Sequence, residues 1–314
     1  MKSNLNITTI DAHYITHNIA ALYMLDKNGH AAFIDTGTQH SFKNVASIMQ
    51  HQGISANNVD YIILTHIHLD HAGGASYMMQ KFPNAKLVVH PFGSRHMIDP
   101  CKLIAGTKTV YGEEKFFELY GQLFPINADR IIETVDEMTL DFQGETLTFL
   151  DTPGHAKHHH CIYYENGDAC FTGDTLGLSY PNLSDNDKKP CLLPTTTPVQ
   201  FSPNDLHQSI DKVMSKDPSI LYPTHYGAVR PSAEVIARYH EHIDIFTMLA
   251  EQTQQESGQE SLIDRLTVKL LNYMSTQVVN NNPNVNLSLA KRYLKTDAEL
   301  NSQGLAIWLK KLQK

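Results

Sequence analysis

Residues 65–74 read Thr65-His66-Ile67-His68-Leu69-Asp70-His71-Ala72-Gly73-Gly74. They directly follow the apolar run 61–64, which has the length and composition of a buried strand. Three imidazoles and one carboxylate, all potential metal ligands, fall within six residues of this stretch. The two glycines allow the backbone to turn sharply into the next element. The stretch therefore predicts a metal site at the end of a strand.

The same arrangement recurs along the chain, because other short apolar runs also end in polar loops. Residues 31–34 lead into Asp35-Thr36-Gly37, and residues 146–150 lead into Pro153-Gly154-His155. Residues 168–172 lead into Gly173-Asp174, and residues 219–222 lead into Pro223-Thr224-His225. Residues 86–90 are one more predicted strand, whereas residues 42–52 have apolar side chains at helical spacing and stop at a glycine. Strands that alternate with helices predict a layered α/β fold whose site lies at the strand ends.

The last 84 residues differ from the first 230 in their pattern. Apolar stripes at helical spacing predict three helices, separated by the polar runs 252–258 and 280–286. The members of the stripes are Ile236, Tyr239, Ile243 and Phe246; Ile263, Leu266, Leu270 and Met274; and Leu305, Trp308, Leu309 and Leu312. We predict a domain over residues 1–230 and a helical extension over residues 231–314 that packs on it. Its helices could cover the pocket, form a homodimer, or complete the core.

Composition restricts the partners and the compartment. The 314 residues carry 25 Lys and Arg against 33 Asp and Glu, a formal charge of −8, which disfavours nucleic acid as a partner. No apolar run approaches the roughly 20 residues that span a bilayer, so no membrane partner is expected. The N-terminus does not resemble a secretory signal, and we expect a cytoplasmic protein. The four cysteines lie far apart and are expected to be reduced and buried. The 18 histidines are the unusual feature.

These motifs, in this order, resemble the metallo-β-lactamase superfamily over nearly the whole chain. The resemblance implies an α/β protein with the four-layer αββα metallo-β-lactamase sandwich and a helical C-terminal section. It also implies two bound metal ions. His66, His68 and His155 would hold the first, Asp70, His71 and His225 the second, and Asp174 would bridge them. This ligand set suits two Zn²⁺ ions, and Fe or Mn is compatible with it.

Two further residues have competing interpretations. By resemblance, Asp35 would support the metal-ligand loop from behind, but Asp-Thr-Gly is also ordinary turn chemistry at a strand end. His159 lies four positions after His155, in the run Lys157-His158-His159-His160. It would orient a ligand or contact substrate, or it would belong to a surface histidine cluster.

The choice of branch within the superfamily rests on individual positions. Flavo-diiron proteins usually place Glu where this chain has His68, nucleases of the fold carry a large inserted domain, and true β-lactamases are typically exported. The metal motifs are similar to those of glyoxalase II enzymes and lactonases. Lactonases usually have Tyr where this chain has Gly177, and Tyr180 is the candidate substitute for that residue. No basic residues match the glutathione site of glyoxalase II. The chain is most similar to a poorly characterised prokaryotic group of metallo-hydrolases, on features such as Leu300-Asn301-Ser302-Gln303-Gly304.

The resemblance implies a dinuclear hydrolase in which a metal-bridging hydroxide attacks an ester, thioester or lactone of a small-molecule substrate, with Asp70 as both ligand and proton shuttle. The alternatives are an iron-dependent persulfide dioxygenase and a metal-binding signalling module without turnover. Two segments are candidate pocket walls: residues 90–122, with Arg95, His96 and Lys102 as possible cations, and the proline-rich loop 177–203. Alternatively, these side chains pack or face water.

Overall fold

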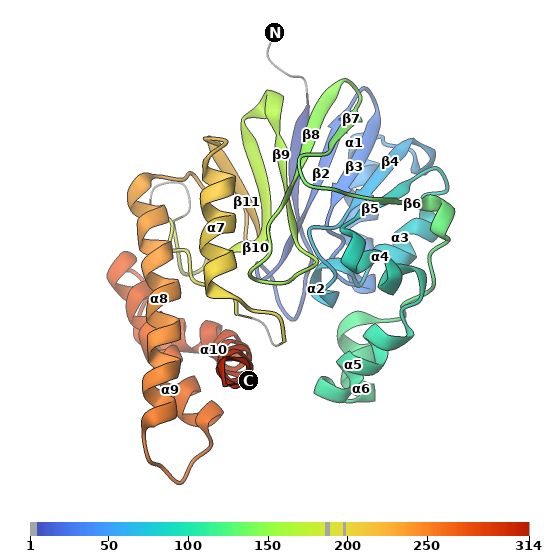
Figure 1. The fold of residues 1–314 in the computed structure, drawn as a ribbon. Coiled ribbons are helices and arrows are strands. Elements are labelled where there is room, and N and C mark those ends of the chain that lie inside the picture. Colours follow the sequence, from blue (N-terminus) through green and yellow to red (C-terminus); the bar gives the residue numbers. More distant parts are fainter. Residues whose placement is uncertain (1–4, 186–188, 197–198, 314) are drawn as a thin grey trace.

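The protein is built around two β-sheets that pack face to face (Figure 1). The computed structural model describes residues 5–185, 189–196 and 199–313. The first sheet has the strand order β1-β2-β3-β4-β5-β6. Its strands are β1 (Asn6–Asp11), β2 (Ala21–Lys27), β3 (His30–Ile34), β4 (Val59–Ile63), β5 (Lys86–Val89) and β6 (Ile131–Glu133). The pairs from β3 to β6 are parallel, so the ends of these strands, and the loops that follow them, lie along one edge.

The second sheet has the order β11-β10-β9-β8-β7. Its strands are β7 (Thr139–Phe142), β8 (Glu145–Asp151), β9 (His160–Tyr164), β10 (Ala169–Leu178) and β11 (Ile220–His225). Only the β10–β11 pair is parallel. The predicted strand 168–172 is longer in the structure: β10 continues past Gly173, where φ is +48° and the register with β11 shifts. Asp174 therefore lies within a kinked strand rather than after it.

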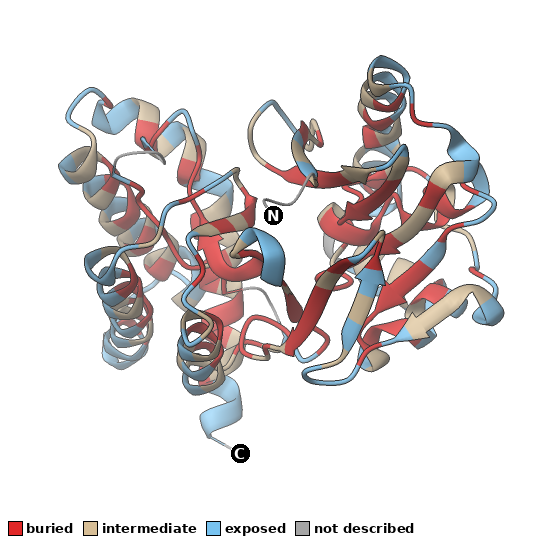
Figure 2. Cartoon of the chain, turned by 90° about the horizontal axis from the view of Figure 1, so that it is seen from above, coloured by how far each residue is buried: buried red, intermediate tan, exposed pale blue. Residues whose placement is uncertain are grey.

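Alternation along β2 explains how the layers form. Leu22 and Met24 pack in the core between the first sheet and its helices, whereas Tyr23 and Leu25 pack in the core between the two sheets. Successive side chains of a strand point to opposite faces, and here both faces are buried. Figure 2 shows buried residues concentrated along the strands and on the helix faces turned toward them.

Helices cover the outer face of each sheet, which gives the predicted four-layer αββα arrangement. The first sheet is covered by α1 (Phe42–Gln52), α3 (Ala75–Lys81) and α4 (Pro91–Ile98), and the second by α7 (Pro203–Met214). The prediction for α1 is confirmed at both ends, and Gly53 closes the helix with φ +69°. Between α4 and β6 lie α5 (Cys101–Tyr111) and α6 (Glu113–Tyr120), which form a pair beyond α4 (Figure 1).

The C-terminal section is helical, as predicted, and consists of α8 (Ala233–Gln255), α9 (Leu262–Asn281) and α10 (Leu287–Leu312). Ser232, Ser261 and Asn286 cap their N-termini. Two residues of the predicted apolar stripes, Ile263 and Leu312, are exposed rather than buried, so the prediction is wrong for them. The last helix is also longer than its stripe and begins at Leu287.

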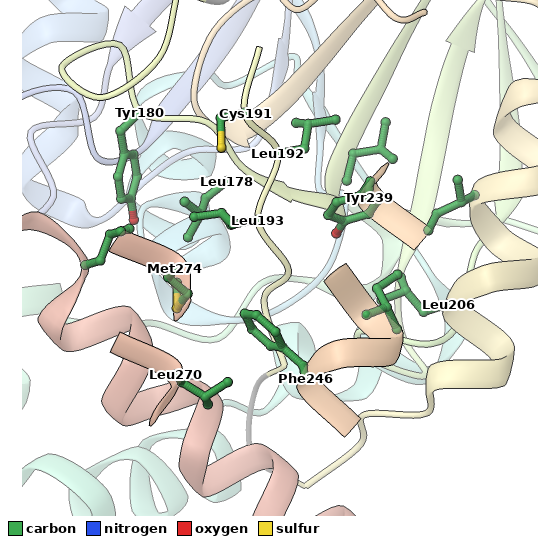
Figure 3. Close-up of a cluster of buried hydrophobic side chains, with 14 of the residues drawn as sticks. Leu178, Tyr180, Cys191, Leu192, Leu193, Leu206, Tyr239, Phe246, Leu270 and Met274 are labelled. Atoms are coloured by element: carbon green, nitrogen blue, oxygen red, sulfur yellow. The ribbon is translucent and has the colours of Figure 1, made fainter. Parts of the chain in front are cut away.

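These three helices share one hydrophobic core with α7 and with the segment that follows β10 (Figure 3). Leu178, Leu193, Leu206, Phe246 and Leu270 all belong to it. Much of the described part of the segment 177–203, which was predicted to be a loop and a candidate pocket wall, packs in this core, and Leu183, Leu192 and Phe201 are among the core residues. Part of the segment, residues 186–188 and 197–198, lies outside the described residues.

Two smaller expectations can be compared with the structure. Cys161, Cys170 and Cys191 are buried thiols, but Cys101, at the start of α5, is exposed, so the expectation of four buried cysteines is wrong for that residue. Among the helices in the described part of the chain, none is both long enough and apolar enough to cross a membrane.

Candidate metal centre

The histidine-rich stretch lies at the edge of the sandwich where β4 ends, and it leads into the short helix α2 (Leu69–Ala72) (Figure 1). His68 is the N-cap of α2, so His66 and His68 precede the helix and Asp70 and His71 lie on it. The glycines that follow are sterically required. A Cβ at Gly74 would lie 2.8 Å from the carbonyl oxygen of Thr38, closer than real Cβ atoms come.

The remaining predicted ligands reach the same edge from the second sheet. His155 lies in the turn after β8, Asp174 in β10, and His225 at the end of β11. All seven predicted ligands therefore meet in one place, although they come from five separate elements or turns. Three overlapping groups in the cluster are compact enough to hold a metal ion: His66, His68 and His155; His66, His71 and Asp174; and Asp70, His71 and His225.

Asp174 lies between two halves of this cluster. Its Oδ2 is 3.3 Å from His155 Nε2, and its Oδ1 is 3.2 Å from His71 Nε2 and 3.5 Å from His225 Nε2. In the first half, the Nδ1 of His68 lies 2.8 Å from His66 Nε2 and 3.0 Å from His155 Nε2. In the second half, the Oδ2 of Asp70 lies 3.7 Å from His71 Nε2 and 3.5 Å from His225 Nε2.

The ring orientations are set from outside the cluster. His71 donates from Nδ1 to Asp35 at 2.9 Å, and His155 and His225 donate from Nδ1 to the backbone oxygens of Thr195 and Ile19, at 3.1 and 2.8 Å. A proton on Nδ1 leaves the Nε2 lone pair free to face the centre of the cluster. Buried His71 Nε2 and Asp174 Oδ1 have no hydrogen-bond partner in the part of the chain that the structure describes. Buried polar atoms are normally satisfied, so this donor set fits a cation.

Asp35 makes several of the hydrogen bonds that hold the ligand loops in place. It is fully buried, with φ +58°, and its Oδ1 accepts the backbone N–H of Thr65 at 2.8 Å. Its Oδ2 accepts from His71 Nδ1 and, at 2.8 Å, from the hydroxyl of Thr224. Thr65 and Thr224 immediately precede His66 and His225, so one carboxylate fixes both ligand loops. Sequence reasoning missed the two threonines, although their position directly before ligand histidines was a usable signal.

His159 is buried beneath Asp174 and is not part of a surface cluster. Its Nε2 accepts the backbone N–H of Asp174 at 3.1 Å, and its Nδ1 lies 2.9 Å from the hydroxyl of Thr152. The ring therefore holds the backbone of Asp174 in place, and it also lies close to two predicted ligands, with its centroid 5.0 Å from that of His66 and 6.0 Å from that of His155. Gly173 is tightly packed between His159 and Thr65, since a Cβ there would lie 2.5 Å from His159 Nε2 and 2.8 Å from Thr65 Cβ.

The two halves of the cluster differ electrostatically. Burial, together with the neighbouring imidazoles, lowers the pKa of His66 and His68 well below the usual value. These rings are neutral and can act as ligands at neutral pH. In the other half, burial is outweighed by Asp174 and Asp70, which raise the pKa of His225 to about 9 and that of His71 well above its usual value. A bound cation would replace those protons.

Among the described residues, the cations predicted in the segment 90–122 make no hydrogen bond or ion pair with the seven ligands, although His96 acts electrostatically on His158, whose ring centroid lies 5.3 Å from that of His68. Arg95 and Lys102 are exposed on α4 and α5, and His96 is partly buried. The side of the cluster near the C-terminal helices instead carries Tyr180, whose hydroxyl donates to Asp297 of α10 at 3.0 Å. No local sequence pattern could have paired these two residues, because they are far apart in the chain.

A comparison with known protein families agrees with the fold and with this cluster. The family model of the metallo-beta-lactamase superfamily matches residues 17–225, well over half of the chain. The chain therefore belongs to the metallo-β-lactamase superfamily.

Individual relatives are distant. ST1585 of Sulfurisphaera tokodaii, a protein described as containing the metallo-beta-lactamase fold, is 26% identical over 217 residues, which cover 68% of this chain and 75% of that protein. The crystal structure of ST1585 aligns with a TM-score of 0.66 at 22% identity, over 96% of this chain and 98% of that one. That likeness shows the fold.

Two curated relatives have names that refer to an activity. Glyoxylase B2 of Dictyostelium discoideum is 30% identical over 143 residues, which cover 45% of this chain and 42% of that protein. Thioesterase pkgB of Emericella nidulans is 26% identical over 218 residues, which cover 69% of this chain and 48% of that protein. The matched region thus spans less than half the length of both relatives.

Proposed function

We propose that the chain is a metal-dependent hydrolase whose seven-residue cluster holds two divalent cations and that it cleaves an acyl bond of a small molecule. The observation that carries the proposal is the position of Asp174, whose two oxygens face different halves of the cluster at 3.3 and 3.2 Å. A carboxylate in this position can serve two ions at once. The first ion would be held by His66, His68 and His155, and the second by Asp70, His71 and His225.

The donor set indicates the type of ion. Imidazole and carboxylate ligands without a thiolate suit Zn²⁺, and Fe or Mn can use the same set. When bound, two such cations lower the pKa of a water molecule and polarise a carbonyl oxygen, so that no protein nucleophile is required. The protein supplies a dry, rigid site: the ligand rings are held by Asp35 and by backbone oxygens, and most of them are buried.

Asp70 has the properties of a proton shuttle. Its side chain is 23% exposed, compared with 1% for His71 and 4% for Asp174, so it is the carboxylate of the cluster that an incoming substrate can reach. Although burial opposes the charge, His71 and His225 lower the pKa of Asp70. The carboxylate is therefore ionised at neutral pH and can accept a proton from the attacking water and pass it to the leaving group.

Within the acyl class, the geometry favours a thioester or an ester over a lactone. Gly177 occupies the position where lactone-cleaving members usually have Tyr. A Cβ there would lie 2.0 Å from the backbone oxygen of Leu193, so no side chain fits. The hydroxyl of Tyr180 is already bonded to Asp297. The names of thioesterase pkgB and glyoxylase B2 agree with this preference.

The first test is a hydrolysis screen of the metal-loaded protein against thioesters, esters, lactones and phosphodiesters. We expect turnover of a thioester or an ester, and a loss of at least about 100-fold in kcat for Asp70→Asn. Asp217→Asn is the matched control, because Asp217 is exposed and has φ +51°, a conformation that Asn tolerates. The proposal fails if no substrate class is turned over or if Asp70→Asn is as active as the control.

The second test is the metal content of the purified protein. Two zinc ions per chain would support the dinuclear hydrolase, whereas a single iron would support a persulfide dioxygenase instead. His66→Ala should lower the content, because the first group of ligands then loses one of its three imidazoles. Unchanged stoichiometry in this variant would contradict the ligand assignment.

A further inference from the structure

Three potential metal ligands outside the cluster converge near the start of the chain. Asp11 is the last residue of β1, and His13 and His17 lie in the segment 12–20 that connects β1 to β2. The Oδ2 of Asp11 lies 3.4 Å from His13 Nε2 and 3.2 Å from His17 Nδ1. The two rings meet edge to face, with their centroids 4.1 Å apart. One ligand atom from each of the three residues lies within 4.8 Å of the other two.

These distances are close to those between the ligands of a tetrahedral ion. With metal–ligand bonds of about 2.0–2.2 Å, ligand atoms in a tetrahedral zinc site are about 3.3–3.6 Å apart. The separation from Asp11 Oδ2 to His13 Nε2, 3.4 Å, is within this range, and the separation to His17 Nδ1, 3.2 Å, is just below it and is that of a hydrogen bond. Two imidazoles and one carboxylate suit Zn²⁺ and its first-row neighbours, whereas Ca²⁺ and Mg²⁺ prefer oxygen ligands alone.

We propose that Asp11, His13 and His17 form a separate binding site for a divalent transition-metal ion, with Zn²⁺ as the preferred ion. The site has three protein ligands, and its histidine side chains are 33% and 72% exposed, so water completes the coordination. Such a site exchanges its ion with solvent more easily than the buried cluster does. It is therefore a structural or regulatory site rather than a second reaction centre.

The ligands are already held in place by Asp11 itself. Its Oδ1 accepts the backbone N–H of His13 at 2.9 Å, and its Oδ2 accepts that of Asn18 at 3.2 Å. Asn44 of α1 donates to the backbone oxygen of Asp11 at 2.8 Å, which ties the site to the first helix. Because the segment is folded back before an ion binds, little further ordering is needed on binding.

The same segment reaches the metal centre. Its residue Ile19 provides the backbone oxygen that accepts from His225 Nδ1 at 2.8 Å. On the other side, Tyr14 stacks against Tyr120 of α6, with ring centroids 6.0 Å apart. An ion bound by Asp11, His13 and His17 would stabilise the segment that orients His225 and that contacts α6. This gives the site a structural consequence that can be measured by thermal unfolding.

The experiment is a calorimetric titration of chelator-treated protein with Zn²⁺, using the wild type and three single variants. His17→Ala removes the most exposed ligand, so the fold should be retained, which circular dichroism checks. His51→Ala is the matched control, because His51 is an exposed histidine in the last turn of α1. His66→Ala disturbs the cluster instead. We expect His17→Ala to bind one ion fewer than wild type and His51→Ala to bind the same number.

The outcomes separate this site from the proposed function. His66→Ala should lose ions from the cluster but keep the weaker ion that His17→Ala lacks. A double variant, His66→Ala/His17→Ala, completes the set: excess Zn²⁺ should raise the Tm of His66→Ala more than that of this double variant. The inference is overturned if His17→Ala binds as many ions as wild type, or if His51→Ala loses the same ion. A His66→Ala variant with wild-type stoichiometry would count against the proposed function alone.

Discussion

Asn301 of α10 bonds the backbone on both sides of Thr195. Its Oδ1 accepts the N–H of Thr196 at 2.5 Å, and its Nδ2 donates to the oxygen of Pro194 at 3.2 Å. The oxygen of Thr195, between these two contacts, accepts from His155 Nδ1 at 3.1 Å. A buried side chain near the end of the sequence therefore fixes the backbone that orients a ligand of the proposed metal centre. The C-terminal helices support the site as well as the core.

This relationship predicts that Asn301→Ala weakens metal binding. The substitution leaves the N–H of Thr196 and the oxygen of Pro194 without this partner, which should lower the free energy of unfolding by about 1–3 kcal/mol. The loosened Thr195 carbonyl should lower the metal affinity at least about tenfold. Competition with a chromogenic chelator measures the affinity, and Lys295→Ala, an exposed change on the same helix, is the control. Equal affinities for the two variants would show that α10 does not act on the metal centre.

A second prediction concerns the tautomer of His71. The carboxylate of Asp35 can only accept, so it keeps the proton of His71 on Nδ1 and leaves Nε2 free for a metal. In Asp35→Asn the new amide can donate to Nδ1 and move the proton to Nε2. We expect a folded protein whose metal affinity is about 10–100-fold lower.

The chain provides a matched control for Asp35→Asn. Asp60 and His30 form a similar pair, with 2.8 Å between Asp60 Oδ1 and His30 Nδ1, at the opposite end of the same two strands, β3 and β4. Asp60→Asn changes the same chemistry away from the metal centre and should leave the metal content unchanged. If both variants lose metal equally, general destabilisation rather than the tautomer of His71 is the cause.

A third prediction compares two glycines. Both Gly177 and Gly29 have positive φ, +63° and +79°, but only Gly177 is crowded, with Leu193 O 2.0 Å from an added Cβ. Gly29→Ala should lower the free energy of unfolding by about 1–2 kcal/mol, the cost of placing a side chain in the left-handed conformation. Gly177→Ala adds a backbone clash within the core and should cost several kcal/mol or prevent folding. Urea unfolding of both variants measures the difference, and similar midpoints would contradict the packing of residues 177 and 193.

Much of the fold was predictable because its local signals are strong. The apolar run 61–64 lies largely within β4 (Val59–Ile63), where Ile62 and Ile63 are fully buried, and Gly53 stops α1 where the apolar spacing ends. Other signals were present but not used. Asn28-Gly29 joins β2 and β3 as a tight hairpin turn, and Leu206, Ile210 and Val213 have the helical spacing of α7.

The candidate site divides in the same way. Its seven clustered side chains could be identified from the sequence, because each lies in a short motif with a fixed position relative to a strand. The hydrogen bonds that Ile19 and Thr195 accept from His225 and His155 could not be predicted, since they are made by backbone oxygens, which carry no residue-specific signal. The pair of Tyr180 and Asp297 could not be predicted either, because it depends on how α10 packs against the segment after β10.

That pair gives the last prediction, which concerns pH. Burial raises the pKa of Asp297 from the usual 3.8 to about 6, against the opposing effects of His225 and of the Tyr180 hydroxyl. The folded protein therefore holds this proton more tightly than the unfolded chain does. The resulting stabilisation is fully present below the unfolded pKa of 3.8 and is lost as the pH rises from there through about 6. Asp297→Asn mimics the protonated carboxyl and retains an acceptor for Tyr180. The Tm of this variant minus that of wild type should thus increase between about pH 4 and pH 6 and then stay constant.

The measurement of this Tm difference uses chelator-treated protein, because a nearby cation would lower the pKa of Asp297, and Asp217→Asn is again the exposed control. A Tm difference that does not change with pH would mean that Asp297 is already ionised throughout this range, and that α10 places a charge, not a neutral acid, beside the metal centre.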